Sequence, residues 1–595
     1  MYTAPTKDLF FAATELADLK GVAALPGHEE VSDELLSAIL EEAGKFASEV
    51  LAPINHKGDI QGARFSDGKV TTPDGWKEAY RQFIDGGWNG LSFDTERGGQ
   101  GLPWLVSAAV QEIWYAANMA FGLCPLLTQG AIEAVESHAS EEQKATYLNN
   151  MVSGEWTGTM NLTEPQAGSD LAAVKTKAVK TNDHYRISGQ KIFITYGDHD
   201  MTENIIHLVL ARTPDAPEGV KGISLFIVPK FLQDDNGNWT IRNDVETLSI
   251  EHKLGIHGSP TAVLGYGNNG GAIGYLVGEE NRGLMYMFTM MNAARHTVGV
   301  QGNAVAERAY QQAIRFAAER VQGKAIEDPM GDRVAIIEHP DVKRLLLVQK
   351  CRIEPLRALC LLTASAMDKA DRHLDDEERK QAQGFIEVMI PIVKGYTTEM
   401  GLENVSLALQ IHGGMGFIEE TGAAQHYRDQ RITPIYEGTT GIQAMDIVGR
   451  KLLRDGGVMA ATVIEMIAED LKSFSSDERI ARMVNALNEA TDDLQLSIAH
   501  ILNLSKENPQ LPAAISEPYL RLWGVLVCGW LSAKAASVAV SKMEDGDDDM
   551  FYQNKIHTAK FYFSTEMPKI KYYAGMIRTS GELIVEMNSD RFSVG

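Results

Sequence analysis

The chain has 595 residues, which is too long for a single hydrophobic core, so several domains are expected. Its 55 Lys and Arg residues against 80 Asp and Glu residues give a net charge of −25, which opposes binding to nucleic acid or anionic lipid. The four cysteines, Cys124, Cys351, Cys360 and Cys528, lack C-x-x-C spacing and are too few for a disulfide framework. We therefore expect a soluble cytoplasmic protein with reduced cysteines.

The N-terminus carries Asp8, Glu15 and Asp18 and has no basic start followed by an apolar run. This pattern is atypical of a secretory signal or an Arg-rich transit peptide. The most apolar segment, residues 522–540, contains Lys534 and several Ser and Ala residues, which favours a buried helix over a membrane span. No membrane insertion is therefore predicted.

Helical patterns dominate the first part of the chain, after an arm of about 30 residues that we expect to be extended. Ser32 is a predicted N-cap, apolar residues then recur at helical spacing, and Pro53 is expected to end this helix. Further helices are predicted over residues 76–83, 106–117 and 141–151. We interpret residues 1–154 as an N-terminal arm and helical domain.

From Gly154 the pattern changes to alternating polar and apolar residues separated by turns. TGTMNLTEP, HYRISGQKIFITYG, NIIHLVLAR and GISLFIV are typical of strands, with a hairpin turn at residues 181–183. Residues 265–270, GYGNNG, match a dinucleotide-binding glycine pattern, but a glycine-broken strand follows where a helix would be required. We predict a middle β-domain over residues 155–282 without a Rossmann site.

Long helices return after Gly283 and continue to the end of the chain. Those that fit an antiparallel four-helix bundle lie at about residues 285–320, 342–370, 377–400 and 403–411. Those of an extra C-terminal helical domain lie at 458–474, 480–503, 516–541 and 551–563. We place these domains at residues 283–450 and 451–595. The acidic run 544–549 lacks EF-hand ligand spacing, so a solvated loop and no metal site are predicted.

The stretch Thr433 to Gln443, TPIYEGTTGIQ, sets the carboxylate of Glu437 in a turn. Pro434 fixes one side of this turn, Gly438 permits close approach, and Thr439 and Thr440 offer hydroxyl and N–H donors. A single Glu in a loop is usually a solvated turn residue. Three further motifs change that interpretation: MNLTEPQAGSD from Met160, QKIFIT from Gln190, and QIHGGMGF from Gln410.

In this order and spacing the four motifs resemble the acyl-CoA dehydrogenase family of flavoproteins, from about Ser32 to about Arg450. The remaining chain resembles the subgroup that carries a long C-terminal extension. The resemblance implies a mainly α fold with a central β-domain: an N-terminal helical domain, a middle β-barrel-like domain, a C-terminal four-helix bundle and an extra C-terminal helical domain. It also implies an enzyme that binds FAD and removes hydrogens from the α and β carbons of an acyl-CoA thioester.

Glu437 matches the family's catalytic base, which removes the α-proton. Some branches carry the base one residue before the arginine matched here by Arg295, but that position is Ala294, which has no acid–base group. The family resemblance assigns a group of further residues to FAD: Leu162, Thr163, Gly168, Ser169, Phe193, Ile194, Thr195, Arg320, Gln322, Gln410, Gly413, Gly414, Thr439 and Gly441. Phe193 stands where the family usually has Trp, so the aromatic surface is retained and the indole N–H is lost.

Several of these residues have simpler alternatives. AGSD around Gly168 also fits a plain hairpin turn, and Arg320 also fits a helix C-terminal charge. In the family, residues matched by Arg320 and Gln322 reach the flavin of a neighbouring subunit, and Gln410, Gly413 and Gly414 match contacts to its pyrophosphate and adenosine. This interpretation requires an oligomer.

The predicted substrate-binding residues are Ser169, Ser259, Arg295 and Gly438. For Ser259 a turn beside Pro260 is an alternative, and Arg295 also fits a helix-surface arginine with its stem on the core. The chain length, the start MYTAPTKDLFF and the layout resemble members that act on 3-methylmercaptopropionyl-CoA in dimethylsulfoniopropionate breakdown. Short- or medium-chain fatty acyl-CoA is the alternative substrate.

The expected electron acceptor is an electron-transfer flavoprotein, and the extension predicts a homodimer, because in extended members it fills the place of a second dimer. Two other functions remain open at this point. One is an acyl-CoA oxidase that uses oxygen, and the other is a catalytically idle assembly protein with the same fold. The presence of Glu437, Arg295 and the flavin motifs favours the dehydrogenase.

Overall fold

The computed structural model describes residues 2–547 and 549–593. The chain forms two compact units, which are described separately. The first contains Ala43–Leu102 and Ala117–Thr297; the second contains Pro5–Glu42, Pro103–Ala116 and the chain from Val298 onward. The predicted domain boundaries after residues 154, 282 and 450 stay a prediction.

The helices that precede the sheet in the sequence follow the predicted pattern, with one correction. Helix α3 (Asp33–Phe46) begins after Ser32, whose hydroxyl accepts a hydrogen bond from the Leu35 N–H as an N-cap. Pro53 does not end the helical path, because it lies in the first turn of α4 (Ala52–Gln61), where its missing N–H is tolerated. The other helices are α5 (Trp76–Asp85), the later part of α6 (Trp104–His138) and α7 (Glu141–Ser153).

An eight-stranded sheet forms the middle of the first unit, with strand order β10-β11-β5-β12-β7-β6-β3 and β4 paired to β5. The strands are β3 (Trp156–Asn161), β4 (Lys177–Lys180), β5 (Tyr185–Thr195), β6 (Asn204–Ala211), β7 (Ser224–Pro229), β10 (Val245–Ile250), β11 (Thr261–Tyr266) and β12 (Ala272–Leu276). Only β3 and β6 run parallel among these pairs of the described sheet. The predicted β-domain and its hairpin between β4 and β5 are confirmed.

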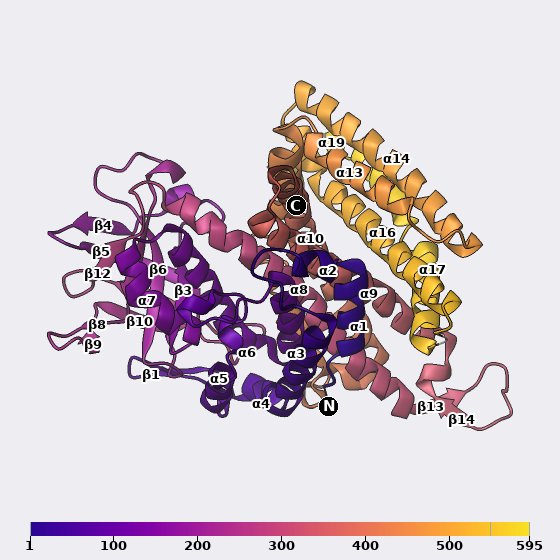
Figure 1. The fold of residues 1–595 in the computed structure, drawn as a ribbon, viewed down its shortest axis with the longest axis horizontal. Helices are drawn as coiled ribbons and strands as arrows, with labels where there is room; N and C mark the ends of the chain where they lie inside the picture. The colour runs from indigo at the N-terminus through magenta and orange to yellow at the C-terminus, as the bar shows by residue number, and fades with distance from the viewer. Residues whose placement is uncertain (1, 548, 594–595) are drawn as a thin grey trace. The chain divides into compact units, whose positions relative to one another are not determined.

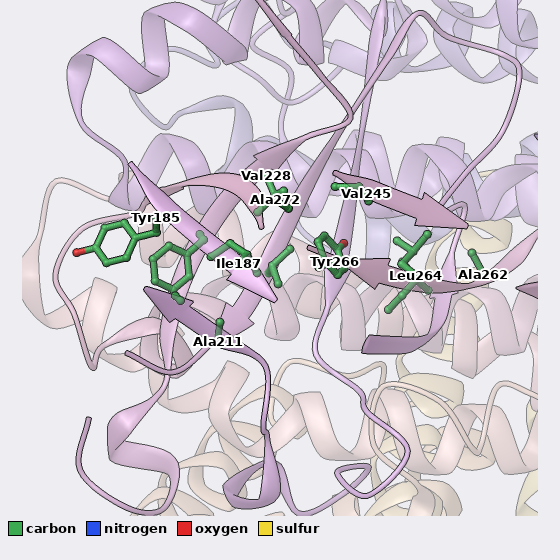
Figure 2. Close-up of a cluster of buried hydrophobic side chains, with 13 residues drawn as sticks. Tyr185, Ile187, Ala211, Val228, Val245, Ala262, Leu264, Tyr266 and Ala272 are labelled. Carbon is green, nitrogen blue, oxygen red and sulfur yellow. The ribbon is translucent and has the colours of Figure 1, made fainter. Parts of the chain in front are cut away.

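Alternating residues of these strands form the core of the sheet. Figure 2 shows Ile187 of β5, Val228 of β7, and Leu264 and Tyr266 of β11 in this core. Their side chains are almost completely buried, and removing such apolar surface from water contributes about 25 cal/mol per Å². The residues on the other face of β5 and β10 are mostly exposed to solvent.

The second unit is helical. The N-terminal arm is not extended as expected, because Thr6–Phe11 forms α1 and Leu19–Ala23 forms α2, with Leu9 and Leu16 buried. Its long helices are α8 (Gly283–Glu319, shared with the first unit), α9 (Pro340–Arg372) and α10 (Asp376–Ile411). The two helices predicted over residues 377–411 form a single helix, α10. The shorter helices α11 (Ala423–Gln430) and α12 (Thr440–Val448) follow.

The C-terminal extension adds seven helices among the described residues: α13 (Val458–Leu471), α14 (Glu478–Glu507), α15 (Gln510–Ala514), α16 (Ser516–Glu544), α17 (Met550–Thr565), α18 (Lys569–Thr579) and α19 (Gly581–Val585). In Figure 1, α14 and α17 both lie beside α16, and contacts of α16 with each of them agree. The predicted helices are confirmed, whereas the short α15, α18 and α19 were not predicted. The acidic loop lies between α16 and α17, and its Asp548 lies outside the described residues.

Helix α16 is the one described helix that is long and apolar enough to cross a membrane by length and composition, and most of its apolar window is buried inside the protein. Its Lys534 pairs with Asp470 at 3.1 Å, and the indole N–H of Trp530 donates to the same carboxylate at 2.7 Å. The four cysteines are unpaired and buried, as predicted.

Candidate functional site

The loop that carries Glu437 is a closed turn at the start of α12. The N–H of Thr440 donates to the Pro434 carbonyl at 3.0 Å and closes the turn. Thr439 is the N-cap of α12, and its hydroxyl accepts a hydrogen bond from the Ile442 N–H at 3.3 Å. The predicted residues Glu437, Gly438, Thr439 and Gly441 therefore lie together in one short, well-anchored segment.

The backbone at Glu437 is in the left-handed region, with φ of +53°, and Gly438 follows with φ of +92°. A non-glycine residue pays about 1–3 kcal/mol for such a conformation, and residues of this kind cluster at functional sites. The amide of Gln443, which has no exposed surface, donates to the carbonyls of Glu437 at 3.4 Å and Gly438 at 3.3 Å. The loop is thus held in a strained conformation by a buried side chain.

Tyr436, next to Glu437, is a partly buried polar residue of this loop. The hydroxyl of Tyr436 donates to the side-chain oxygen of Gln301, which is completely buried in α8. Burial raises the pKa of Tyr436 well above its usual value, and the nearby Tyr115 and Glu437 add to this shift. Tyr436 is therefore a neutral hydrogen-bond donor beside the carboxylate.

In the first unit, the predicted flavin residues lie on two adjacent segments. The N–H of Ile192 donates to the Thr163 carbonyl at 2.9 Å, which joins the end of β3 to β5. Leu162 and Thr163 are partly exposed at this junction, and Ile194 is buried beneath it. The motifs MNLTEP and QKIFIT are thus in direct contact.

Strand β5 carries a β-bulge at the predicted flavin position. Ile194 pairs with Ala262 of β11, and Lys191 pairs with Leu264. Two residues of β5 therefore lie between these pairs, opposite one residue of β11. The extra residue redirects Phe193, which has φ of +60° and is 59% exposed. Bulges and positive φ values concentrate next to functional sites. An exposed ring on a strained backbone offers a flat apolar surface to a planar ligand.

Sequence reasoning missed Glu164 and Lys191, although both lie inside the quoted motifs. Their ion pair measures 2.8 Å, and neither side chain is more than 3% exposed. Lys191 also donates to the Leu162 carbonyl at 3.0 Å, and Glu164 accepts from the Thr176 hydroxyl at 2.6 Å and the Lys175 N–H at 2.8 Å. A Lys inside an apolar strand was the signal that could have identified this pair.

This buried pair fixes the segment that precedes the exposed loop around Ser169. Burial would raise the pKa of Glu164, but Lys191 and the hydrogen bonds outweigh it and lower the pKa to about 2. Burial lowers the pKa of Lys191 to about 8, against the attraction of Glu164. Both groups are charged at neutral pH, so the pair joins the two motifs electrostatically.

The other predicted residues of the first unit lie in different environments. Gly168 and Ser169 are exposed, and within the described chain no atom lies within 4 Å of a Cβ built at Gly168. Ser259 has no exposed surface, its N–H closes a turn with Ile256, and its carbonyl accepts from Lys253 at 2.9 Å. Arg295 is 5% exposed on α8.

In the second unit, the residues predicted to reach a neighbouring subunit's flavin are all on the surface. Arg320 directly follows α8, and Gln322 lies in strand β13 (Val321–Lys324), where its carbonyl is hydrogen-bonded to the ring of His339 at 2.7 Å. Gln410, Gly413 and Gly414 are exposed at the end of α10. Their roles stay a prediction.

Comparison with known families identifies the fold. Four family models match in order: the acyl-CoA dehydrogenase N-terminal domain (33–155), middle domain (159–268) and C-terminal domain (281–453), and the "acetyl-CoA dehydrogenase C-terminal like" domain (463–588). The chain belongs to the acyl-CoA dehydrogenase family. The predicted resemblance and fold class are confirmed, as is the prediction of an oxidoreductase.

Named relatives agree with this family. The chain is 50% identical to 3-methylmercaptopropionyl-CoA dehydrogenase of Ruegeria pomeroyi, over 94% of this chain and 95% of that protein. It is 35% identical to a butyryl-CoA dehydrogenase of Syntrophomonas wolfei, over 99% of each chain. A solved acyl-CoA dehydrogenase from Bacillus anthracis, complexed with FAD, shares the fold with a TM-score of 0.72, 22% identity and coverage of 96% and 91%.

Proposed function

We propose that this acyl-CoA dehydrogenase oxidises 3-methylmercaptopropionyl-CoA to methylthioacryloyl-CoA, with FAD as the cofactor, in dimethylsulfoniopropionate breakdown. The observation that carries the proposal is the 50% identity to the Ruegeria pomeroyi enzyme over almost the full length of both chains. The 35% identity to butyryl-CoA dehydrogenase supports a short-chain fatty acyl-CoA as the second candidate substrate.

Glu437 is the proposed base that accepts the α-proton of the thioester. Its strained backbone and the anchoring of its loop by Gln443 favour a fixed carboxylate position, which proton transfer requires. FAD supplies the acceptor for the hydride that leaves the β-carbon. Tyr436, neutral and bonded to Gln301, keeps a polar partner beside Glu437 without adding a charge.

The residues of the first unit fit a flavin. The exposed ring of Phe193 can pack against a planar ring system, and the partly exposed Leu162 and Thr163 lie on the adjoining segment. The Glu164–Lys191 pair would hold both segments at a fixed spacing. We therefore propose Leu162, Thr163, Phe193, Ile194 and Thr195 as flavin contacts.

We propose Gly168 and Ser169, in the exposed loop, as further flavin contacts, and Thr439 and Gly441 on the base loop. Ser169, Ser259, Arg295 and Gly438 are proposed to contact acyl-CoA. For Ser259, which is completely buried, this contact would require the turn at Ile256 to move.

The substrate is tested with a matched pair of thioesters. Pentanoyl-CoA replaces the sulfur of 3-methylmercaptopropionyl-CoA with a methylene and keeps the chain length. We expect kcat/KM to be at least about tenfold higher for the thioether, which is the discrimination that one well-fitted atom group provides. Equal or faster oxidation of pentanoyl-CoA or butyryl-CoA would overturn the proposed substrate and leave the reaction class intact.

We further propose that an electron-transfer flavoprotein reoxidises the enzyme, and that the enzyme is a cytoplasmic homodimer. Exposed apolar side chains support a subunit interface on the second unit. They are Val321, Ile326, Met330, Met415 and Phe417, in the hairpin after α8 and the turn after α10. Light scattering should give the mass of two chains, and a monomer or tetramer mass would contradict the dimer. Rapid peroxide formation when the reduced enzyme meets air would instead indicate an oxidase.

A further inference from the structure

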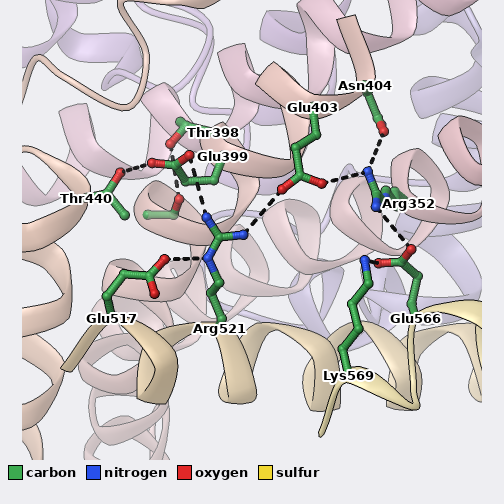
Figure 3. A network of polar contacts seen from close by, with 11 residues as sticks. Arg352, Thr398, Glu399, Glu403, Asn404, Thr440, Glu517, Arg521, Glu566 and Lys569 are labelled. Atoms are coloured by element: carbon green, nitrogen blue, oxygen red, sulfur yellow. Dashed lines mark hydrogen bonds and ion pairs between the residues drawn. The ribbon is translucent and has the colours of Figure 1, made fainter. Parts of the chain in front are cut away.

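The C-terminal extension makes polar contact with the bundle through Arg521 of α16. Figure 3 shows its guanidinium between carboxylates from two helices. Arg521 pairs with Glu517 of its own helix, with Glu403 of α10 at 3.3 Å, and with Glu399 of α10 at 3.8 Å. The side chains of Arg521 and Glu399 are both mostly buried. Arg521 therefore bridges the extension and α10.

Glu399 connects this bridge to the loop of the catalytic base. Its other carboxylate oxygen accepts a hydrogen bond from the Thr440 hydroxyl at 2.6 Å. Thr440 is three residues after Glu437, and its N–H closes the base loop on Pro434. Arg521, Glu399 and Thr440 thus form a continuous polar chain from the extension to the base loop (Figure 3).

The ion-pair network around Arg521 has fewer cations than carboxylates, and Glu399 is the carboxylate that also accepts a hydrogen bond from Thr440. The network has four carboxylates and three cations. The carboxylates are those of Glu399, Glu403, Glu517 and Glu566, and the cations are Arg352, Arg521 and Lys569. Glu399 has the longest ion pair of the set, so the short hydrogen bond from Thr440 supplies its closest donor. Loss of Arg521 would leave Glu399 a mostly buried acid without a cation among the described residues of this network.

Apolar packing follows the same path. Helix α12 contacts both α10 and α16, and α10 also contacts α16. The side chains of Leu520 in α16 and Gln443 in α12 both lie within 4 Å of a Cβ built at Gly395 of α10. Gln443 is the residue that holds the carbonyls of Glu437 and Gly438. Leu520 of the extension and Gln443 of α12 therefore pack at the same position of α10, beside the polar chain through Arg521.

We infer that Arg521 of the C-terminal extension is a positioning residue for the catalytic base, acting through Glu399 and Thr440. This inference rests on the proposed role of Glu437. It gives the extension a part in the chemical step: it holds the base loop in its strained conformation while the α-proton is transferred. Misplacement of a catalytic group by about 1 Å costs up to about 100-fold in rate, so a partial release of the loop is measurable.

The test is anaerobic stopped-flow reduction of the flavin, using the acyl-CoA that reduces the wild-type enzyme fastest. Arg521→Met removes the cation, and Thr440→Val removes the hydroxyl while keeping the β-branched shape. Each is expected to lower the limiting reduction rate roughly tenfold with an unchanged Kd for acyl-CoA. The double variant is expected to be no slower than the slower single variant, because both act on one chain.

Two controls separate positioning from general damage. Thr440→Ser retains the hydroxyl and is expected to reduce at close to the wild-type rate. Lys569→Met removes the ion pair at the far end of the same network, 2.8 Å from Glu566 and separated from Arg521 by Arg352 and Glu403, and is expected to match the wild type. If Arg521→Met does not fold, the comparison of Thr440→Val with Thr440→Ser still decides, because it changes a single hydroxyl.

Glu437→Gln distinguishes the two levels of the proposal. If it still reduces its flavin, Glu437 is not the base and the positioning role falls with it. If Glu437→Gln is inactive while Arg521→Met and Thr440→Val keep the wild-type rate, only the positioning role is refuted. Rates in the double variant that fall by the product of the single effects would show that Arg521 and Thr440 act independently, which also refutes the chain.

Discussion

The Glu164–Lys191 pair is the buried contact whose loss has the clearest predicted effect. Lowering the pKa of Glu164 from 4.5 to about 2 corresponds to about 3 kcal/mol of stabilisation of its charged form. The desolvation of Lys191, whose pKa falls from 10.5 to about 8, offsets a similar amount. The intact pair therefore adds little net stability, whereas removing one partner leaves an unpaired buried charge.

Lys191→Met is expected to lower the free energy of unfolding by roughly 3 to 5 kcal/mol, and to release FAD at a lower urea concentration. The double variant Lys191→Met with Glu164→Gln is expected to recover part of that loss, since no buried charge remains. The assay is urea unfolding followed by far-UV circular dichroism and flavin fluorescence. Arg282→Met is the control, because its 3.0 Å pair with Glu279 is more than half exposed and contributes at most about 1 kcal/mol. A loss in Lys191→Met no larger than in this control would show that the unpaired Glu164 carboxylate does not destabilise the fold.

Three further outcomes follow from single sites. The pKa of Glu164 is lower in the folded than in the unfolded state, so the stabilisation from its charged form is present above about pH 4.5 and is lost as the pH falls towards 2. In Glu164→Gln the free energy of unfolding should therefore depend less on pH over this range. Phe193→Gly relieves the positive φ, so the apo-protein should gain about 1 kcal/mol in thermal unfolding while its Kd for FAD rises; unchanged FAD affinity would contradict the flavin role. Gly524→Ala places a Cβ about 2.2 Å from the Tyr396 ring and should lower Tm, whereas Gly575→Ala, with no described atom within 4 Å, should not.

Much of the fold could be predicted from periodicity, because long helices and alternating strands bury one face. The helix breaks show where local signals fail. Pro53 was expected to end a helix, but a proline in the first turn of a new helix loses no hydrogen bond, so the path continues through α4. The gap predicted near residue 401 does not exist, since Gly401 is packed inside α10 against Gly302 and Gln430. Tertiary packing decided both cases.

The candidate site could be predicted as residue types but not as geometry. The motif around Glu437 indicated a turn, yet its positive φ and the amide of Gln443 depend on the packing of α12. The exposure of Phe193 depends on a bulge that is visible only in the strand register. Arg521 lies 84 residues after Glu437 in the sequence and carries no motif, so only the fold brings its helix to the base loop.

The role of Glu437 as the base is tested by anaerobic bleaching of the flavin absorbance by 3-methylmercaptopropionyl-CoA, in the wild type and in Glu437→Gln. We expect the wild type to bleach rapidly and the variant to retain FAD and stay oxidised, because no carboxylate accepts the α-proton. A Glu437→Gln enzyme that bleaches at the wild-type rate would contradict the assignment of the base.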